Sequence, residues 1–408
     1  MKKINILVVL VFCTVSLFAQ FASNWQVDFQ DSPTLNYSNE GRKVITDANS
    51  NIFVLGDYSS DRDSAGHTTG TTQYTVRLQK YNYNGVLQTW VYIPVNGLIT
   101  NGFDNRNSFG LELDASGNVY IGYSVYNNSG DFDLVIRKYS NTLTLKWTYV
   151  YATSNQDVGV DLKLNGTTAY AIVKSYAGAN TSYALVAASS GGNFSVPLYS
   201  FVNNVDVINA LNTSGNKFIY VTGYSLISGA KAALTAAISS VGTLKWKVNY
   251  NHGSVTGDDL GNSLELGSDG YIYVAGTTYT SAANGTDALV LKYSASGIQQ
   301  GLLTLDRSAV DVGCSVKAGP SGYMYVASSN ASSYAVYKVQ MNPLNANISA
   351  SSYPTPISSY LSITNTVVSD MKVAASGNVY VCGYVDATSA AGNFSASFLE
   401  KLGLNGFL

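Results

Sequence analysis

Residues 261–297 read GNSLELGSDGYIYVAGTTYTSAANGTDALVLKYSASG, and this stretch contains three short strand-like runs. The runs cover residues 264–266, 271–275 and 288–293. Ser-Asp-Gly separates the first two runs and Ser-Ala-Ser-Gly follows the third, and such glycine-containing groups favour tight turns between strands. The stretch therefore predicts three consecutive β-strands joined by turns.

The middle run of this stretch occurs seven times along the chain. The copies are NIFVLG, NVYIGY, TAYAIV, FIYVTG, YIYVAG, YMYVAS and NVYVCG, and their marker aromatics are Phe53, Tyr120, Tyr170, Tyr220, Tyr273, Tyr325 and Tyr380. Successive markers are separated by 67, 50, 50, 53, 52 and 55 residues. A period near fifty with several short strands per unit is typical of a β-propeller. We therefore predict an all-β, seven-bladed β-propeller.

The outermost strand of a unit often begins with tryptophan, at Trp90, Trp147 and Trp246. The C-terminal run KLGLNGFL matches KYNYNGVL at residues 80–87 and then stops, whereas Ser-Asn-Trp25 matches Gln-Thr-Trp90. We therefore expect residues 20–40 to supply the outer strand of the last blade. The predicted propeller spans residues 20–408 as four-stranded antiparallel blades. Closing the ring in this way hides a sheet edge that could otherwise pair with other chains.

Residues 1–19 have the pattern of a cleaved secretory signal peptide. Lys2 and Lys3 precede an apolar run over residues 4–18, and Ala19 is a plausible cleavage point. No later segment is apolar enough to predict a transmembrane helix. We expect a secreted, periplasmic or cell-surface protein. With 23 basic against 25 acidic residues, no charge excess directs it to nucleic acid or acidic lipid.

The repeats resemble the bacterial SBBP-type β-propeller repeat family, whose units look like D-x-G-x-x, G-N-V-Y-V-x-G, K-Y and G-x-x-x-W in order. The second, fourth, fifth and seventh units carry most of this pattern. The units at residues 162–201 and 315–363 have drifted from it. The resemblance implies an extracellular or cell-surface propeller and no particular reaction.

An acidic residue recurs where four innermost strands are expected to begin, at Asp157, Asp206, Asp259 and Asp311. Carboxylates converging at a channel mouth could hold Ca²⁺, which takes about six to eight oxygen ligands. Alternatively, each Asp could accept hydrogen bonds from its own turn. Repetition in four units favours the structural role. The resemblance to the SBBP repeats, whose pattern has an Asp at this position, also favours the structural role.

Tyrosines recur just after the marker strands, and those at Tyr58, Tyr126, Tyr176 and Tyr279 are candidate ligand contacts. Exposed rings could stack on sugars, whereas buried rings would pack between blades. The longest predicted loops on that face cover residues 57–73, 249–261 and 277–287.

The sequence contains no recognisable catalytic motif. His67 and His252 are the only histidines and fall in separate predicted loops, and no pair of carboxylates is singled out. Cys314 and Cys382 could form a disulfide or remain buried thiols. We expect a monomeric, non-catalytic scaffold without a cofactor that binds a polysaccharide or a protein.

The alternative is a carbohydrate-active hydrolase or lyase with a site on the loop face. An enzyme should have a deep pocket with convergent acids or histidines. A scaffold should present a shallow face lined by Tyr, Asn and Ser.

Overall fold

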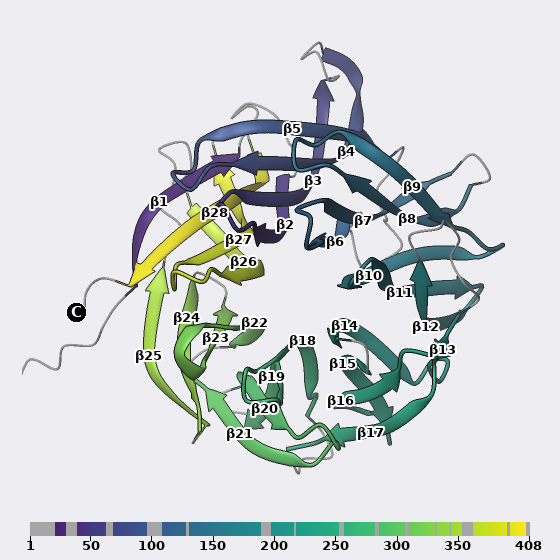
Figure 1. Cartoon of the computed structure of the whole chain (residues 1–408), viewed down its shortest axis with the longest axis vertical. Helices are drawn as coiled ribbons and strands as arrows, with labels where there is room; N and C mark the ends of the chain where they lie inside the picture. The colour runs from purple at the N-terminus through teal and green to yellow at the C-terminus, as the bar shows by residue number, and fades with distance from the viewer. Residues whose placement is uncertain are drawn as a thin grey trace, which may run out of the picture.

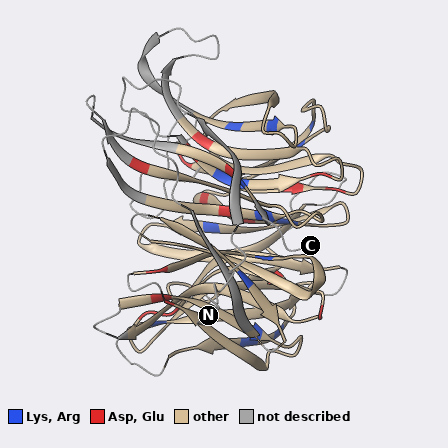
Figure 2. Cartoon of the chain, turned by 90° about the vertical axis from the view of Figure 1, so that its left-hand side faces the viewer, with Lys and Arg blue, Asp and Glu red and all other residues tan. Residues whose placement is uncertain are grey.

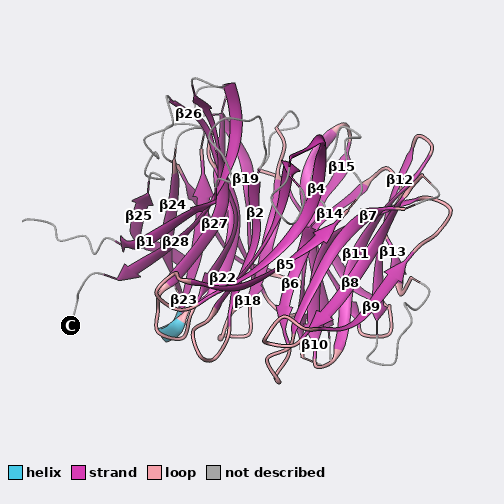
Figure 3. Ribbon diagram, turned by 90° about the horizontal axis from the view of Figure 1, so that it is seen from above, coloured by secondary structure: helices cyan, strands magenta, loops and turns pink. Residues whose placement is uncertain are grey.

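The structure is a computed structural model, and it describes most of the chain after residue 20. The described residues are 21–29, 39–62, 68–95, 108–127, 130–188, 197–215, 218–252, 257–281, 285–306, 310–330, 333–342, 344–352, 362–389 and 392–404. Within these ranges the chain forms 28 β-strands and one short 3₁₀ turn, η1 (Pro320–Gly322) (Figure 3). The predicted signal peptide lies outside the described residues.

The strands form seven four-stranded antiparallel sheets, which surround a central axis as the blades of a propeller (Figure 1). Blade 1 contains β2 (Asn39–Thr46), β3 (Ile52–Arg62), β4 (Thr68–Tyr81) and β5 (Leu87–Pro94). Blade 2 contains β6 (Ser108–Leu113), β7 (Val119–Tyr126), β8 (Phe132–Tyr139) and β9 (Leu145–Tyr151). Blade 3 contains β10 (Gln156–Asn165), β11 (Thr168–Ala177), β12 (Asn180–Ala188) and β13 (Tyr199–Ser200).

The remaining blades repeat this order. Blade 4 contains β14 (Asp206–Ser214), β15 (Phe218–Ile227), β16 (Ala230–Ser239) and β17 (Leu244–Tyr250). Blade 5 contains β18 (Leu260–Leu266), β19 (Ile272–Ser281), β20 (Gly285–Tyr293) and β21 (Gln299–Leu305). Blade 6 contains β22 (Val312–Ala318), β23 (Tyr323–Ser329), β24 (Tyr334–Met341) and β25 (Leu344–Ser352). Blade 7 contains β26 (Ser362–Val373), β27 (Val379–Ser389), β28 (Gly392–Leu404) and, from the other end of the chain, β1 (Phe21–Phe29).

The closure of the ring confirms the sequence prediction. Strand β1 pairs antiparallel with β28, and the purple and yellow strands lie side by side in Figure 1. Trp25 is paired with Lys401 in the same way that Trp147 is paired with Lys138 in blade 2. The described part of this outer strand covers Phe21–Phe29, within the predicted segment 20–40.

The core lies between neighbouring blades rather than inside one sheet. Strand β7 is buried over Val119–Ser124, as expected of a middle strand covered on both faces, whereas β9 has an alternating pattern of exposure. Phe53 and Leu55 of blade 1 share one apolar cluster with Ile121 of blade 2. Burying each such side chain contributes roughly 1.5–3 kcal/mol, which makes blade-to-blade packing the main source of stability.

Two of the predicted loops are largely strand. In the segment 57–73 the ladder between β3 and β4 continues through Ser60↔Gln73 and Arg62↔Thr68. In the segment 277–287, β19 and β20 remain paired as far as Ser281↔Gly285. These segments are polar but rich in Thr and Tyr, which favour extended pairing, and polarity was a poor guide to the strand ends.

In the described residues blade 3 has the shortest outer strand, and its sequence lacks the Trp with which that strand begins in other blades. Strand β13 contains only two residues. Pro197 lies just before it and has no N–H to donate to a ladder. In blade 4, by contrast, Trp246 donates its indole N–H to Ala295 O of the next blade at 2.9 Å and packs over Gly297.

The two cysteines in the described part of the chain form no disulfide. Basic and acidic residues are interspersed over the strands rather than gathered by sign (Figure 2). Both Cys314 and Cys382 are free thiols. Among the residues described, no helix has the length and apolar character needed to cross a membrane.

Candidate functional site

The propeller axis contains a cavity of about 950 Å³. It is lined mainly by the first strand of each blade, with Lys174, Tyr183, Tyr224 and Tyr384 added from later strands. Residues far apart in the sequence therefore meet around one space.

Every first strand contains a β-bulge at the same place. The register shifts lie between Gly41 and Lys43, Ser108 and Gly110, Gly159 and Asp161, Ile208 and Ala210, Gly261 and Ser263, Gly313 and Ser315, and Val368 and Asp370. A bulge bends its strand and redirects the side chains that follow. The repeated bulge thus gives the same orientation to equivalent residues of all seven blades.

Two rings of equivalent residues follow from this register. The post-bulge ring consists of Lys43, Gly110, Asp161, Ala210, Ser263, Ser315 and Asp370. The aromatic-paired ring consists of the residues opposite the marker aromatics, namely Ile45, Glu112, Lys163, Asn212, Glu265, Lys317 and Lys372. In each blade the two ring members are two residues apart, so their side chains lie on the same side of the strand. Together the rings carry four lysines and four acids.

The post-bulge ring connects each blade to the next. Asp161 accepts a hydrogen bond from the Leu211 N–H at 3.0 Å. Asp370 accepts one from the Val44 N–H at 3.3 Å, and Ser263 accepts one from the Val316 N–H at 3.3 Å. In all three cases the donor is the residue that directly follows the post-bulge ring member of the next blade. These side chains therefore satisfy backbone donors at the inner edge of a blade, where no further strand is available.

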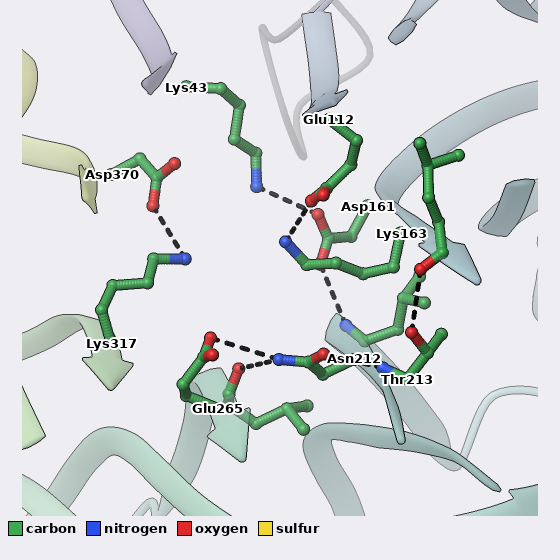
Figure 4. A network of polar contacts seen from close by, with 12 residues as sticks. Lys43, Glu112, Asp161, Lys163, Asn212, Thr213, Glu265, Lys317 and Asp370 are labelled. Atoms are coloured by element: carbon green, nitrogen blue, oxygen red, sulfur yellow. Dashed lines mark hydrogen bonds and ion pairs between the residues drawn. The ribbon is translucent and has the colours of Figure 1, made fainter. Parts of the chain in front are cut away.

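Ion pairs cross the same cavity (Figure 4). Lys43 Nζ lies 3.0 Å from Asp161 Oδ1, reaching from blade 1 to blade 3 past Gly110, which has no side chain to obstruct it. Lys317 Nζ lies 3.3 Å from Asp370 Oδ1, and Lys163 pairs with Glu112.

These contacts set the protonation of the ring. Burial would lower the pKa of Lys163, but the Glu112, Asp161 and Glu265 carboxylates outweigh it and raise that pKa. Glu265 differs, because burial raises its pKa more than the nearby lysines lower it. Its carboxylate accepts a hydrogen bond from Asn212 Nδ2 at 3.2 Å.

Lys372 is the exception among the charged ring residues. Within the described residues its ammonium makes no hydrogen bond or ion pair, whereas every other charged member of the two rings has a polar partner. Its ring neighbours are Lys317 in blade 6 and the apolar Ile45 in blade 1. Burial and the Lys317 charge lower its pKa, against the opposing effect of Glu265.

The four predicted aspartates are buried at the starts of their own blades. Asp157 accepts from the Thr153 N–H at 2.7 Å and from Ser175 Oγ at 2.6 Å. Asp206 is bonded in the same way to Val202 N and Ser225 Oγ, and Asp259 to His252 N and Thr278 Oγ1. These bonds support the structural interpretation of the repeated Asp.

Within the described part of the chain, one group of acidic residues could hold a shared cation, and it consists of Asp287, Asp306 and Asp311. One carboxylate oxygen of each lies within 4.8 Å of the others. The other three predicted aspartates do not belong to this group. Asp287 and Asp306 come from blade 5 and Asp311 precedes blade 6. A calcium ion bound jointly by the four predicted residues is therefore not supported by their positions.

The candidate tyrosines differ in exposure. Tyr58 is only 2% exposed, donates to Gln79 Oε1 at 2.9 Å and lies under the Arg77 guanidinium, so it packs within blade 1. Tyr126 is 38% exposed beside Phe132. Tyr176 and Tyr279 are half-buried.

The remaining reactive side chains form no catalytic arrangement in the described residues. His252 is exposed and its Nδ1 lies 3.1 Å from the Tyr250 hydroxyl, while His67 lies outside the described residues. Burial raises the pKa of the Cys382 thiol well above its ordinary value, which disfavours the reactive thiolate.

The cavity fits neither sequence expectation fully. It is hollow and contains convergent acids, unlike the shallow face predicted for a scaffold. However, Glu112, Asp161 and Asp370 are each held by a lysine, so they are poorly placed as the free carboxylate of a glycosidase pair.

The sequence analysis missed the two rings, although a signal was present. A polar or charged residue lies eight residues before the marker aromatic in five units and seven before it in another. In the first unit Ile45 takes this place. A polar or charged residue at a nearly fixed distance before an apolar marker strand indicates a shared polar environment.

No family model matches the chain, and no curated protein matches it in sequence. The SBBP resemblance therefore remains a prediction. Among solved structures, the chain is similar to the Dos1 propeller, with a TM-score of 0.51 and 8% identity over 95% of this chain and 96% of that one. At this identity the similarity shows the fold alone, a β-propeller.

Two further solved structures come from Bacteroides species. A putative 6-phosphogluconolactonase from Bacteroides uniformis has a TM-score of 0.49 and 12% identity over 88% of this chain and 94% of that one. The extracellular domain of a putative hybrid two-component system from B. thetaiotaomicron has a TM-score of 0.47 and 13% identity over 93% of this chain. The match spans 40% of that domain's chain.

Proposed function

We propose that this protein is a secreted, non-catalytic scaffold that binds an extended polar ligand, a polysaccharide, at the mouth of the central cavity. The observation that carries this proposal is the polar cavity to which all seven blades contribute. Its walls are paired strands held in place by blade-to-blade hydrogen bonds, and sites on such rigid elements bind precisely positioned ligands well.

Aromatic and amide groups around the cavity suit a saccharide. Tyr224 and Tyr384 lie in its lining and offer rings that can stack on sugar faces. Tyr126, Tyr176 and Tyr279 lie at or near the ends of the second strands of blades 2, 3 and 5 and would extend the contact. Tyr58 is excluded from this role by its burial.

The binding test is a screen of purified protein against an array of polysaccharides, followed by variants. Tyr384→Ala should weaken binding about tenfold, as for a centrally placed aromatic contact. Tyr83→Ala is the matched control, because Tyr83 is 55% exposed in the turn between β4 and β5. Shortened saccharide products would instead support the hydrolase or lyase alternative. Binding of proteins but no polysaccharide would contradict the proposed ligand class.

Secretion is the second part of the proposal and depends on the Lys2–Lys3 start and the apolar run before Ala19. N-terminal sequencing of the exported protein should find Gln20 as the first residue. A retained Met1, or a lipid attached at Cys13, would contradict it.

A further inference from the structure

Among the described residues, Lys372 is the ring lysine whose ammonium has no hydrogen-bond or ion-pair partner, and the Glu265 and Glu112 carboxylates act on it only through the electrostatic field. Lys372 belongs to β26 and to the aromatic-paired ring, and it lies in the cavity lining. Burying a charge without a partner is costly, and proteins normally avoid it by pairing the charge. The other three ring lysines are paired in this way, through Lys43–Asp161, Lys163–Glu112 and Lys317–Asp370.

The neighbours of Lys372 make one sector of the ring cationic. Lys317 is the equivalent residue of blade 6, and Ile45 of blade 1 supplies no charge on the other side. Two other neighbouring pairs of the aromatic-paired ring do contact each other, namely Lys163 with Glu112 and Asn212 with Glu265. The missing interaction at blades 6, 7 and 1 is therefore a place for an anion supplied from outside.

We propose that this sector binds the carboxylate of an acidic sugar, a hexuronate, with Lys372 as its main ligand and Lys317 beside it. The proposal rests on the saccharide-binding function only for the sugar part of the ligand. One uncompensated ammonium matches a monoanion. A phosphate dianion would also be repelled by Asp370, which is already bonded to Lys317, and by Glu265.

The first experiment measures binding of D-galacturonate, D-galactose and inorganic phosphate to the full chain by calorimetry in a carboxylate-free buffer. Galacturonate should bind, and galactose should bind at least about tenfold more weakly, because a charge-assisted hydrogen bond is lost. Lys372→Met should weaken galacturonate binding by a similar factor. Lys245→Met is the control, because Lys245 is exposed on the outer strand β17, and it should change nothing.

A second pair of variants keeps Lys372 and supplies an internal counter-ion. Ile45→Glu places a carboxylate in the next blade, as Glu265 is placed relative to Asn212, and should abolish galacturonate binding. Ile45→Gln removes the same apolar side chain but introduces no charge. The difference between these two variants therefore isolates the effect of the counter-ion.

The outcomes separate this proposal from the proposed function. If galacturonate binding survives both Lys372→Met and Ile45→Glu, or if phosphate binds more tightly through Lys372, the carboxylate site is wrong. Binding of a neutral polysaccharide without galacturonate would also overturn it, while leaving the scaffold function intact. Galacturonate binding that needs Lys372, with no polysaccharide bound, would support the site and contradict the scaffold function.

Discussion

The Asp370 side chain contacts the blades on both sides of its own. From blade 7 it accepts the Val44 N–H of blade 1 and pairs with Lys317 of blade 6. Burial alone would raise its pKa, but Lys317, Lys43 and Lys163 outweigh burial and hold that pKa below its ordinary value. Asp370 therefore remains ionised and holds three blades together where the ring closes.

Asp370→Asn should lower the free energy of unfolding by about 3 kcal/mol, because removing one partner of a buried pair leaves the other uncompensated. Urea unfolding at pH 7 measures this loss. Asp258→Asn is the control: its pair with Lys231 is partly exposed and should be worth less than about 1 kcal/mol.

The effect of Asp370→Asn should depend on pH in a defined direction. A carboxyl whose folded-state pKa is lowered stabilises the fold above its ordinary pKa of 3.8 and loses that effect as the pH falls through the folded-state value. The difference between wild type and variant should therefore shrink below about pH 4. A difference that stays constant through that range would contradict the ionised role.

Lys372 should behave in the opposite way, because its charged form is disfavoured in the folded protein. With no ligand bound, Lys372→Met should be more stable than wild type at pH 7. Wild type should recover as the pH rises towards the ordinary value of 10.5, where the folded chain releases this proton before the unfolded chain does. Thermal melting from pH 7 to 10 tests this, and a less stable Lys372→Met at pH 7 would refute it.

For single residues, the sequence indicated which positions recur better than it indicated which side chains contact each other. The Asp157 position was recognised because it recurs, and its hydrogen bond from the Thr153 N–H is consistent with the role in each turn that repetition favoured. The rings were missed because their members differ in charge from blade to blade, so they look unrelated until register aligns them. Lys43 and Asp161 are 118 residues apart, and no local pattern could indicate their contact.

Among the elements, the first strand of one blade comes close to the second strand of the preceding blade where both have glycine, as at Gly313 and Gly276. A Cβ added at Gly313 of β22 would lie 2.5 Å from Gly276 O of β19, closer than real Cβ contacts allow. The glycine at the end of the YIYVAG marker therefore serves the contact with the next blade.

Gly313→Ala should accordingly destabilise the protein by about 1–3 kcal/mol, since backbone must move to relieve the overlap. Gly301→Ala is a matched control on the outer strand β21, where the nearest atom is the Leu344 Cδ2 at 3.1 Å, at the end of a flexible side chain. Melting temperatures of the two variants give the comparison. Equal melting temperatures would mean that the close approach is not a constraint.

Elements were predictable where burial decides the sequence. All seven marker runs form second strands, because a strand covered on both faces must be apolar along its length. The ends of the hairpins were not predictable. Beyond Tyr58 the β3–β4 ladder continues through Ser60 and Arg62, where the sequence has no apolar run that would mark a strand.

For the whole molecule, stability depends on closing the ring without a covalent link. An apolar cluster spans the junction, joining Val44 and Ile52 of blade 1 to Tyr380 and Leu399 of blade 7. Strand β1 completes blade 7 by pairing with β28, and Cys314 and Cys382 are free thiols. Reducing agents should therefore leave the melting temperature unchanged.

Removing β1 tests this closure most directly. A chain that starts at residue 30 would lose all the paired residues from Phe21↔Leu404 to Phe29↔Ser397. At about 1 kcal/mol for each lost hydrogen bond, the free energy of unfolding should fall by several kcal/mol. A chain that starts at Phe21 is the matched control and should melt like the mature protein.

The truncation should also change the oligomeric state, because β28 becomes an exposed edge that can pair with another chain. Analytical ultracentrifugation should show a monomer for the chain that starts at Phe21 and concentration-dependent association for the one that starts at residue 30. A synthetic peptide of residues 20–29 should bind the vacant edge, restore the melting temperature and suppress association, since strand addition needs only the backbone ladder and the correct register. An unchanged melting temperature on truncation, or a peptide without effect, would mean that the three strands β26, β27 and β28 suffice to close the ring.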